Sequence, residues 1–261
     1  MRDFYLGYSP KSPPALARFI EKIVLGLALL VAAIALLLVR GQAPFENSTF
    51  EFGKLRTLVG TIVERPYPTL LVAHTGESAS PDRYLAYLLV APGKHGAGSS
   101  VAGFDSKKVR MQGTLIYRDG RRMLELVPGS ITTLGAAPAK DEALRDLGPV
   151  TATGEIVDSK CYLGVMNHGQ GKVHRSCAAR CLSGGIPPLF VVENPLSSGS
   201  DGVTGGQFLL VGPSGLAIGP DALREFVAEP ITVHGELLQR GGMRFLQVDP
   251  HTLRHRSVLL P

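Results

Sequence analysis

The sequence predicts a mainly β protein, in which one amino-terminal transmembrane helix precedes two tandem OB-like small β-barrels. The second barrel is expected to carry an insertion with cysteine and histidine side chains. Three observations predict this class: an uncharged apolar run near the amino terminus, a series of strand and turn signals that occurs twice, and three cysteines confined to one stretch of the second copy. A hydrophobic content of 44% with 31 glycines is typical of turn-rich globular structure and not of disorder.

The apolar run extends from Ile23 to Val39 without a charged residue. With Phe19 and Ile20 it comes to about 20 residues, the length that a helix needs to cross a bilayer core of roughly 30 Å. We therefore predict a transmembrane helix over residues 19–40. A cleaved signal peptide is the alternative, but about 22 residues precede the run and no good small-x-small cleavage site follows it.

Positive charges set the expected orientation of this helix. Arg2, Lys11, Arg18 and Lys22 precede the run, whereas only Arg40 follows it closely. The positive-inside rule keeps such an amino terminus in the cytoplasm, so residues 1–18 are expected there and the rest of the chain is expected outside the membrane. In a bacterium this is a single-pass inner-membrane protein with its carboxy-terminal domains in the periplasm, where disulfides are permitted.

The remainder of the chain contains an internal repeat. Each copy shows signals for about five short strands in the same order, with a glycine inside the first and the fourth strand. The corresponding segments are 57–63 and 150–157, 87–93 and 208–215, 109–115 and 231–237, and the hairpins 118–126 and 240–246. Because a small barrel must bend at such glycines, we predict OB-like barrels over residues 50–131 and 150–256. An antiparallel sandwich with the same number of strands is the alternative.

Two connecting segments complete the prediction. A short helix over Pro220 to Ala228 falls between the third and fourth strands of the second copy, which is the OB-like order. Residues 132–149 are rich in Ala, Pro and charge, and we expect them to form a linker with a short helix near Lys140 to Leu147.

The second copy is longer than the first. Gly60 and Val90 are 30 positions apart, whereas the corresponding Gly154 and Val211 are 57 apart. The extra residues are assigned to an insertion at about 161–188.

This insertion holds all three cysteines of the chain and two histidines. The candidate metal ligands are Cys161, His168, His174, Cys177 and Cys181. The composition between Gly171 and Gly184 predicts a helix over Lys172 to Leu182, which places His174, Cys177 and Cys181 on one face. Three thiolates and one imidazole satisfy zinc, and copper(I) also favours soft sulfur ligands.

A disulfide is the competing interpretation, with Cys161, Cys177 and Cys181 as candidates. On a helix the Cβ atoms of Cys177 and Cys181 lie roughly 5 to 6 Å apart, which is wider than a disulfide prefers. A bridge from Cys161 to either of them is easier and leaves one thiol over. A haem or a redox-active thiol is a third, less favoured interpretation. We assign no catalytic residue, because Asp158, His174 and a cysteine would need the geometry of a base and nucleophile and no hydrolase signature accompanies them.

Three weaker signals have simple structural explanations. Gly184 to Pro188 forms either a pocket wall or a turn into the next strand. Lys94 to Gly98 is only superficially like a phosphate loop, since no helix of adequate length is expected after it. Several basic residues give the first barrel a solvated face or a contact for anionic lipid headgroups, namely Lys107, Lys108, Arg110, Arg118, Arg121 and Arg122.

The pattern as a whole resembles bacterial membrane-anchored envelope proteins with tandem OB-like domains and no assigned activity. The most specific part of the resemblance is the segment from Cys161-Tyr162 to Gly184-Gly185-Ile186-Pro187-Pro188, and the resemblance covers most of the chain. It implies an envelope location and brings no catalytic residues with it.

These observations favour a non-catalytic function over an enzymatic one. We expect a membrane-anchored periplasmic accessory or assembly subunit of a membrane complex that handles metal or electrons, with the membrane and other subunits as partners. The alternatives are a thiol- or metal-dependent redox enzyme centred on the cysteines and a module that binds peptide or glycan. Nucleic acid is not expected as a partner, because the chain has no Trp and 7% aromatic residues.

Overall fold

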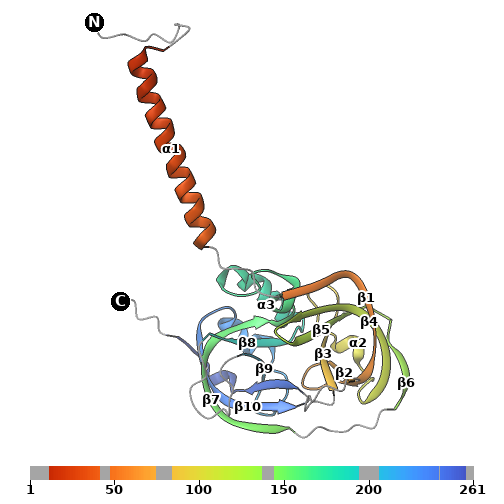
Figure 1. Cartoon of the computed structure of the whole chain (residues 1–261). Helices are drawn as coiled ribbons and strands as arrows, with labels where there is room; N and C mark the ends of the chain where they lie inside the picture. Colours follow the sequence, from red (N-terminus) through yellow and green to blue (C-terminus); the bar gives the residue numbers. More distant parts are fainter. Residues whose placement is uncertain are drawn as a thin grey trace. The chain divides into compact units, whose positions relative to one another are not determined.

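The computed structural model describes residues 12–41, 48–74, 84–136, 144–193, 206–240 and 242–256. The chain divides into two compact units, residues 1–46 and 47–261. The first unit contains helix α1 (Pro14–Gly41), and the second contains all the strands (Figure 1). The class is mainly β, as predicted, with 45% of the described residues in strands.

Helix α1 is 28 residues long and none of its side chains is buried. It begins at Pro14, five residues before the predicted start at residue 19, because proline is well suited to the first position of a helix. At 1.5 Å per residue it extends over about 42 Å, which exceeds a bilayer core of roughly 30 Å. The helix is therefore long and apolar enough to span a membrane.

The first barrel closes in the order β1-β2-β3-β5-β4-β1. Its strands are β1 (Ser48–Val63), β2 (Thr69–Ala73), β3 (Tyr84–Val90), β4 (Lys107–Arg118) and β5 (Arg121–Leu126). A single helical turn, α2 (Gly98–Val101), connects β3 to β4, and a further strand, β6 (Thr132–Ala136), pairs with β4. Strands β3 and β5 are parallel, and the other pairs are antiparallel.

The second barrel repeats this order as β7-β8-β9-β11-β10-β7. Its strands are β7 (Arg145–Asp158), β8 (Pro188–Val192), β9 (Gln207–Val211), β10 (Ile231–Arg240) and β11 (Met243–Gln247), with the short β12 (Arg254–His255) against β10. The predicted helix between the third and fourth strands is present as α4 (Pro220–Leu223) followed by a 3-10 turn over Arg224–Phe226. Two closed five-stranded barrels confirm the predicted tandem small barrels over the sandwich alternative.

Four glycines sit where the first and fourth strands of each barrel bend. A Cβ atom on Gly154 in β7 would lie 2.0 Å from the carbonyl oxygen of Val191 on β8. A Cβ atom on Gly60 in β1 would likewise lie 2.4 Å from a carbonyl oxygen of the neighbouring strand. In the fourth strands, the corresponding distances from a Cβ atom to a carbonyl oxygen are 2.5 Å at Gly113 and 2.3 Å at Gly235. These distances are too short for any side chain, so the glycines allow the neighbouring strand to approach the bend.

The segment predicted as a linker is largely strand. Thr132–Ala136 form β6, and Arg145 to Pro149 belong to β7, so the prediction of a linker over the whole of 132–149 was wrong. The expected short helix was also wrong over 145–147, where β7 pairs with β10, while residues 140–143 lie outside the described part. Every residue of β6 is exposed, which explains why its sequence shows no alternation of apolar and polar residues.

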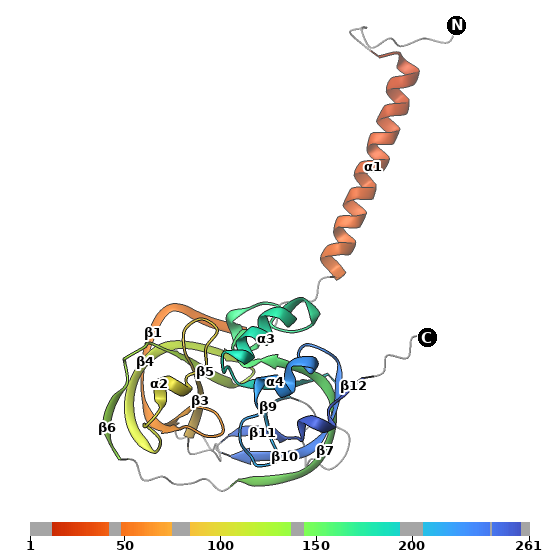
Figure 2. The ribbon, with the colours of Figure 1, turned by 180° about the vertical axis from the view of Figure 1, so that it is seen from behind.

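Apolar side chains fill each barrel and also join the two. Leu89 and Leu124 point into the first barrel, whereas their neighbours Leu88 and Met123 pack against Leu209 and other residues of the second. Strands β3 and β9 are therefore buried on both faces, which accounts for the continuous apolar runs in their sequences. Figures 1 and 2 show the barrels side by side, with helix α3 (Arg175–Ser183) at one end of their junction.

Candidate metal centre

The insertion connects the first two strands of the second barrel. Residues 159–187 lie between β7 and β8, whereas residues 64–68 make the same connection in the first barrel. The insertion begins with a helical turn over Cys161–Val165 and continues through a 3-10 turn over Lys172–His174 into α3. The helix predicted over Lys172 to Leu182 is thus present, with its first turn tightened.

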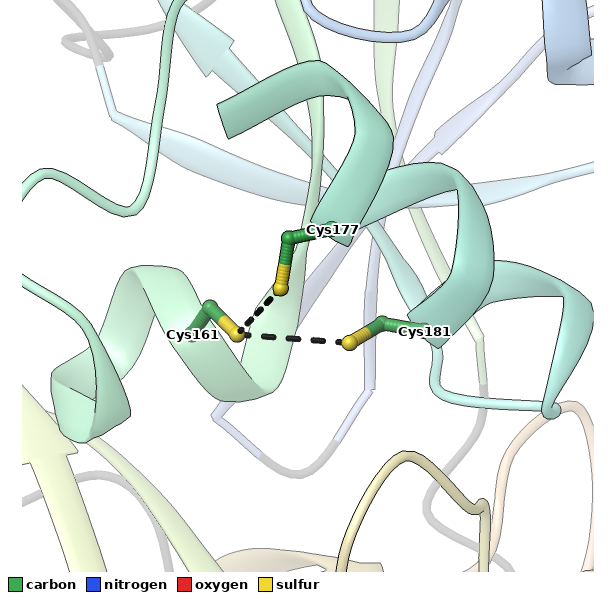
Figure 3. A group of neighbouring side chains, drawn as sticks. All are labelled: Cys161, Cys177 and Cys181. Carbon is green, nitrogen blue, oxygen red and sulfur yellow. Dashed lines mark hydrogen bonds between the residues drawn. The ribbon is translucent and has the colours of Figure 1, made fainter. Parts of the chain in front are cut away.

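Three thiols converge between this first turn and α3. The Sγ atom of Cys161 lies 3.9 Å from that of Cys177 and 4.0 Å from that of Cys181 (Figure 3). All three sulfurs lie within 4.8 Å of one another. A point equidistant from three sulfurs with these separations lies roughly 2.3–2.5 Å from each, close to the length of a Zn–S bond, about 2.3 Å.

The three thiols are only partly shielded from solvent. Cys161 and Cys181 are buried, and Cys177 is partly exposed, so the group has one side open to solvent. All three are free thiols in the structure. A disulfide requires its sulfurs to be about 2.05 Å apart, so pairing any two of these thiols would need a movement of nearly 2 Å.

The two histidines of the insertion lie in different places. His174 is buried, and its Nε2 atom lies 3.0 Å from Oδ2 of Asp158. Asp158, Cys161 and His174 form a second group whose ligand atoms lie within 4.8 Å of one another, so Cys161 belongs to both groups. His168 is exposed, in the loop between the turn Cys161–Val165 and the 3-10 turn Lys172–His174. It belongs to neither of the two groups found among the described residues.

Asp158 holds the two halves of the site together. It is the last residue of β7, is fully buried, and accepts a hydrogen bond of 2.8 Å from the backbone N–H of Cys161 as well as contacting His174. A buried carboxylate is costly unless its oxygens have partners, and these two contacts supply them. The strand end therefore fixes both the turn that carries Cys161 and the start of α3.

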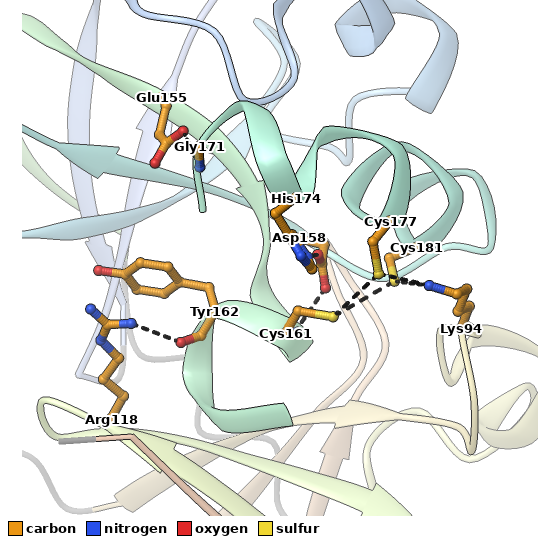
Figure 4. A network of polar contacts seen from close by, with 10 residues as sticks. All are labelled: Lys94, Arg118, Glu155, Asp158, Cys161, Tyr162, Gly171, His174, Cys177 and Cys181. Carbon is orange, nitrogen blue, oxygen red and sulfur yellow. Dashed lines mark hydrogen bonds and ion pairs between the residues drawn. The ribbon is translucent and has the colours of Figure 1, made fainter. Parts of the chain in front are cut away.

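A lysine from the first barrel completes the site, and no local pattern in the sequence indicates this role. The Nζ atom of Lys94, in the loop between β3 and α2, lies 2.7 Å from Sγ of Cys177 and 3.8 Å from Sγ of Cys181 (Figure 4). Its hydrogen bond to Cys177 raises the pKa of Lys94. Lys94 and Cys177 are 83 positions apart, so only the packing of the two barrels brings them together.

The thiols differ in how readily they ionise. The hydrogen bond from Cys161, helped by the charge of Lys94, lowers the pKa of Cys181. The same hydrogen bond, burial and the carboxylate of Asp158 raise the pKa of Cys161. Of these two thiols, Cys181 is thus the one on which negative charge is favoured.

Glycines allow the loop of Lys94 to approach the end of α3. The backbone N–H of Gly96 donates a hydrogen bond of 2.9 Å to the carbonyl oxygen of Gly184. A Cβ atom on Gly184 would lie 1.8 Å from the carbonyl oxygen of Lys94, and one on Gly96 would lie 2.1 Å from that of Gly185. The segment Gly184 to Pro188 fits both interpretations offered from the sequence. It is a turn into β8, and it also forms part of the wall of a cavity of about 460 Å³ between the barrels.

The residues on either side of Cys161 bind the first barrel. Lys160 is buried, forms an ion pair with Glu125, and donates hydrogen bonds of 2.9 and 2.7 Å to the carbonyl oxygens of Ala91 and Gly93. On the other side, the guanidinium of Arg118 stacks 3.9 Å from the ring centroid of Tyr162 and donates to its carbonyl oxygen (Figure 4). Cys161 is therefore clamped between two contacts with the other barrel.

Comparison with family models, with curated proteins and with solved structures found no match to this chain.

Proposed function

We propose that this chain is a single-pass membrane protein of the bacterial envelope that binds one thiophilic metal ion through Cys161, Cys177 and Cys181. It serves a membrane complex as an accessory or assembly subunit. The observation that carries the proposal is the spacing of the three sulfurs, which suits a metal ion at their centre. Zinc with a water molecule as fourth ligand and three-coordinate copper(I) both fit a set of three thiolates.

The surroundings of the thiols support a metal site over a disulfide. Three thiolates carry three negative charges, and Lys94 places a positive charge against two of the sulfurs. A disulfide would leave one thiol unused and would not need this lysine. The buried contacts of Asp158 and Lys160 hold Cys161 in place before any ion binds, which lowers the cost of ordering the ligands.

Elemental analysis of the full chain tests this proposal. The protein is extracted in detergent under reducing, oxygen-free conditions and incubated with Zn²⁺ or with Cu(I), and bound metal and reactive thiols are counted. We expect one metal per chain and protection of three thiols until a chelator is added. Cys161→Ser, Cys177→Ser and Cys181→Ser should each abolish stoichiometric binding.

Ser176→Ala is the matched control, since Ser176 is exposed on the same helix and precedes Cys177 directly. One disulfide, one free thiol and no bound metal in the native chain would overturn the metal site. Stoichiometric metal that persists in all three serine variants would place the metal elsewhere.

The membrane orientation has its own test. The positive charges before the apolar run Ile23 to Val39 support a cytoplasmic amino terminus and barrels outside the inner membrane. A carboxy-terminal fusion to a reporter that is active only in the periplasm should be active, and a fusion to a reporter that is active only in the cytoplasm should be silent. The opposite pair of results would overturn the envelope location.

A further inference from the structure

A second candidate site lies between the barrels and is separate from the thiols. It is a cleft of about 610 Å³ whose walls come from both barrels. Its size is that of pockets for small organic ligands, which range over about 300–1,000 Å³. None of the three cysteines lines it, so an inference about the cleft does not depend on the metal site.

Equivalent positions of the two barrels face each other across this cleft. The pairs Arg118–Arg121 and Arg240–Met243 close the corresponding hairpins, so Arg122 and Arg244 occupy the same position in the two barrels. In the same way Leu88 pairs with Met123 and Leu209 pairs with Phe245, and both leucines line the cleft. The cleft is thus a product of how the repeated units pack on each other.

The charge of the cleft is strongly positive. Arg121, Arg122 and Arg244 line it, and Asp119 is the single carboxylate among its described lining residues. The carboxylate of Asp119 is already engaged, by Nε2 of Gln207 at 3.2 Å and by Nε of Arg118 at 3.5 Å.

Two of the arginines contact backbone carbonyl groups among the described residues. Arg121 donates to the carbonyl oxygen of Gln207, and Arg122 donates to that of Gly120 at 3.2 Å. Burial and the positive charge of Arg244 lower the pKa of Arg121 to about 10. Two cations held near each other in a sheltered site destabilise the protein unless an anion joins them.

The three arginines narrow the chemistry of the ligand. Guanidinium groups bind phosphate through paired hydrogen bonds, and a phosphate offers more acceptor oxygens to three arginines than a carboxylate does.

We propose that this cleft binds a phosphate ester, with Arg121, Arg122 and Arg244 holding the phosphate. The cleft is far larger than a phosphate ion, so the organic part of the ester occupies the remaining space. A soluble phosphate ester and the headgroup of a phospholipid share this chemistry.

Calorimetric titration of the full chain in a non-ionic detergent tests the proposal with two probes. These are glycerol 3-phosphate and a short-chain phosphatidylglycerol below its micelle concentration, both titrated at fixed salt. We expect saturable binding at one site, weakened by about tenfold or more in Arg122→Gln and in Arg244→Gln, since hydrogen bonds to a charged group contribute about 1.5–3 kcal/mol. Tighter binding of the lipid assigns the site to a headgroup, and tighter binding of the ester assigns it to a soluble ligand.

Arg110→Gln is the matched control, because Arg110 is an exposed arginine of the first barrel that does not line the cleft. Circular dichroism confirms that each variant is folded. The proposal is overturned if neither probe binds at about 10 mM, if both cleft variants bind as the native chain does, or if Arg110→Gln weakens binding equally.

Discussion

Cys161 contributes a thiol to the candidate metal site and also lies where the insertion contacts the first barrel. Its sulfur faces Cys177 and Cys181, its backbone N–H is held by Asp158, and its neighbour Lys160 reaches into the other barrel. A side chain with so many fixed surroundings has little freedom to move. The thiol group is accordingly preorganised in the manner expected of a ligand set rather than of a mobile redox pair.

Lys94 is predicted to strengthen metal binding without being a ligand. Its ammonium group faces the thiolates, so Lys94→Met should weaken metal affinity by about tenfold, and Lys94→Arg should restore part of it. Competition with a coloured chelator measures the affinity. Lys108→Met, at an exposed position of β4, should leave it unchanged. An affinity unaltered by Lys94→Met would show that the lysine does not act on the bound ion.

At the scale of elements, the insertion is a helical hairpin added to one of two otherwise similar barrels. The position of the insertion against the first barrel depends on glycines where the end of α3 contacts the loop after β3. The contact between Gly184 and the loop of Lys94 leaves no room for a methyl group. The position of Lys94 is therefore a consequence of backbone packing as well as of its own side chain.

Gly184→Ala tests this contact. The new methyl group would lie 1.8 Å from a backbone oxygen, so the loop must move and the protein should lose about 1–3 kcal/mol of unfolding free energy. Metal affinity should fall with it, because Lys94 moves away from the sulfurs. Chemical denaturation and metal competition measure the two effects. Gly98→Ala is the control, since a Cβ atom there meets nothing within 4 Å.

The elements that could be predicted from the sequence are those with a local signature. Apolar strands, the glycine bends and the turn at Asp119-Gly120, where both residues have positive φ, were all visible as patterns. Strand β6 and the first part of β7 lack such a pattern, because their residues are exposed or only partly buried.

The same distinction holds for the candidate site. The three thiols lie on one short stretch and were found from spacing alone. Lys94 and Arg118 reach the insertion from the first barrel, so their part depends on how two barrels pack and leaves no trace in the local sequence.

At the scale of the molecule, the two barrels form one unit rather than two independent domains. An apolar cluster crosses the junction, and the buried pair of Lys160 with Glu125 lies beside it. We therefore expect the two barrels to unfold together.

Lys160→Met should destabilise this whole unit. It leaves the carboxylate of Glu125 without its buried partner and two carbonyl groups without a donor, so we expect a loss of about 3 kcal/mol. Urea unfolding of the full chain in detergent, followed by circular dichroism, should still show one transition at lower urea. Lys172→Met, whose side chain is 76% exposed, should change stability by less than about 1 kcal/mol. Two separate transitions in the native chain would contradict the coupling of the barrels.

The position of the thiols in the chain affects the time for which they are exposed during synthesis. Lys94 and its barrel are made first, and Cys161 to Cys181 follow, but the strands that complete the second barrel run to Gln247. At about 5–20 residues per second, the thiols emerge several seconds before their cover is complete. In an oxidising compartment that interval is when a wrong disulfide forms. For the metal site proposed above, prompt delivery of the metal or of a reductant would therefore bear on the yield of correctly folded protein.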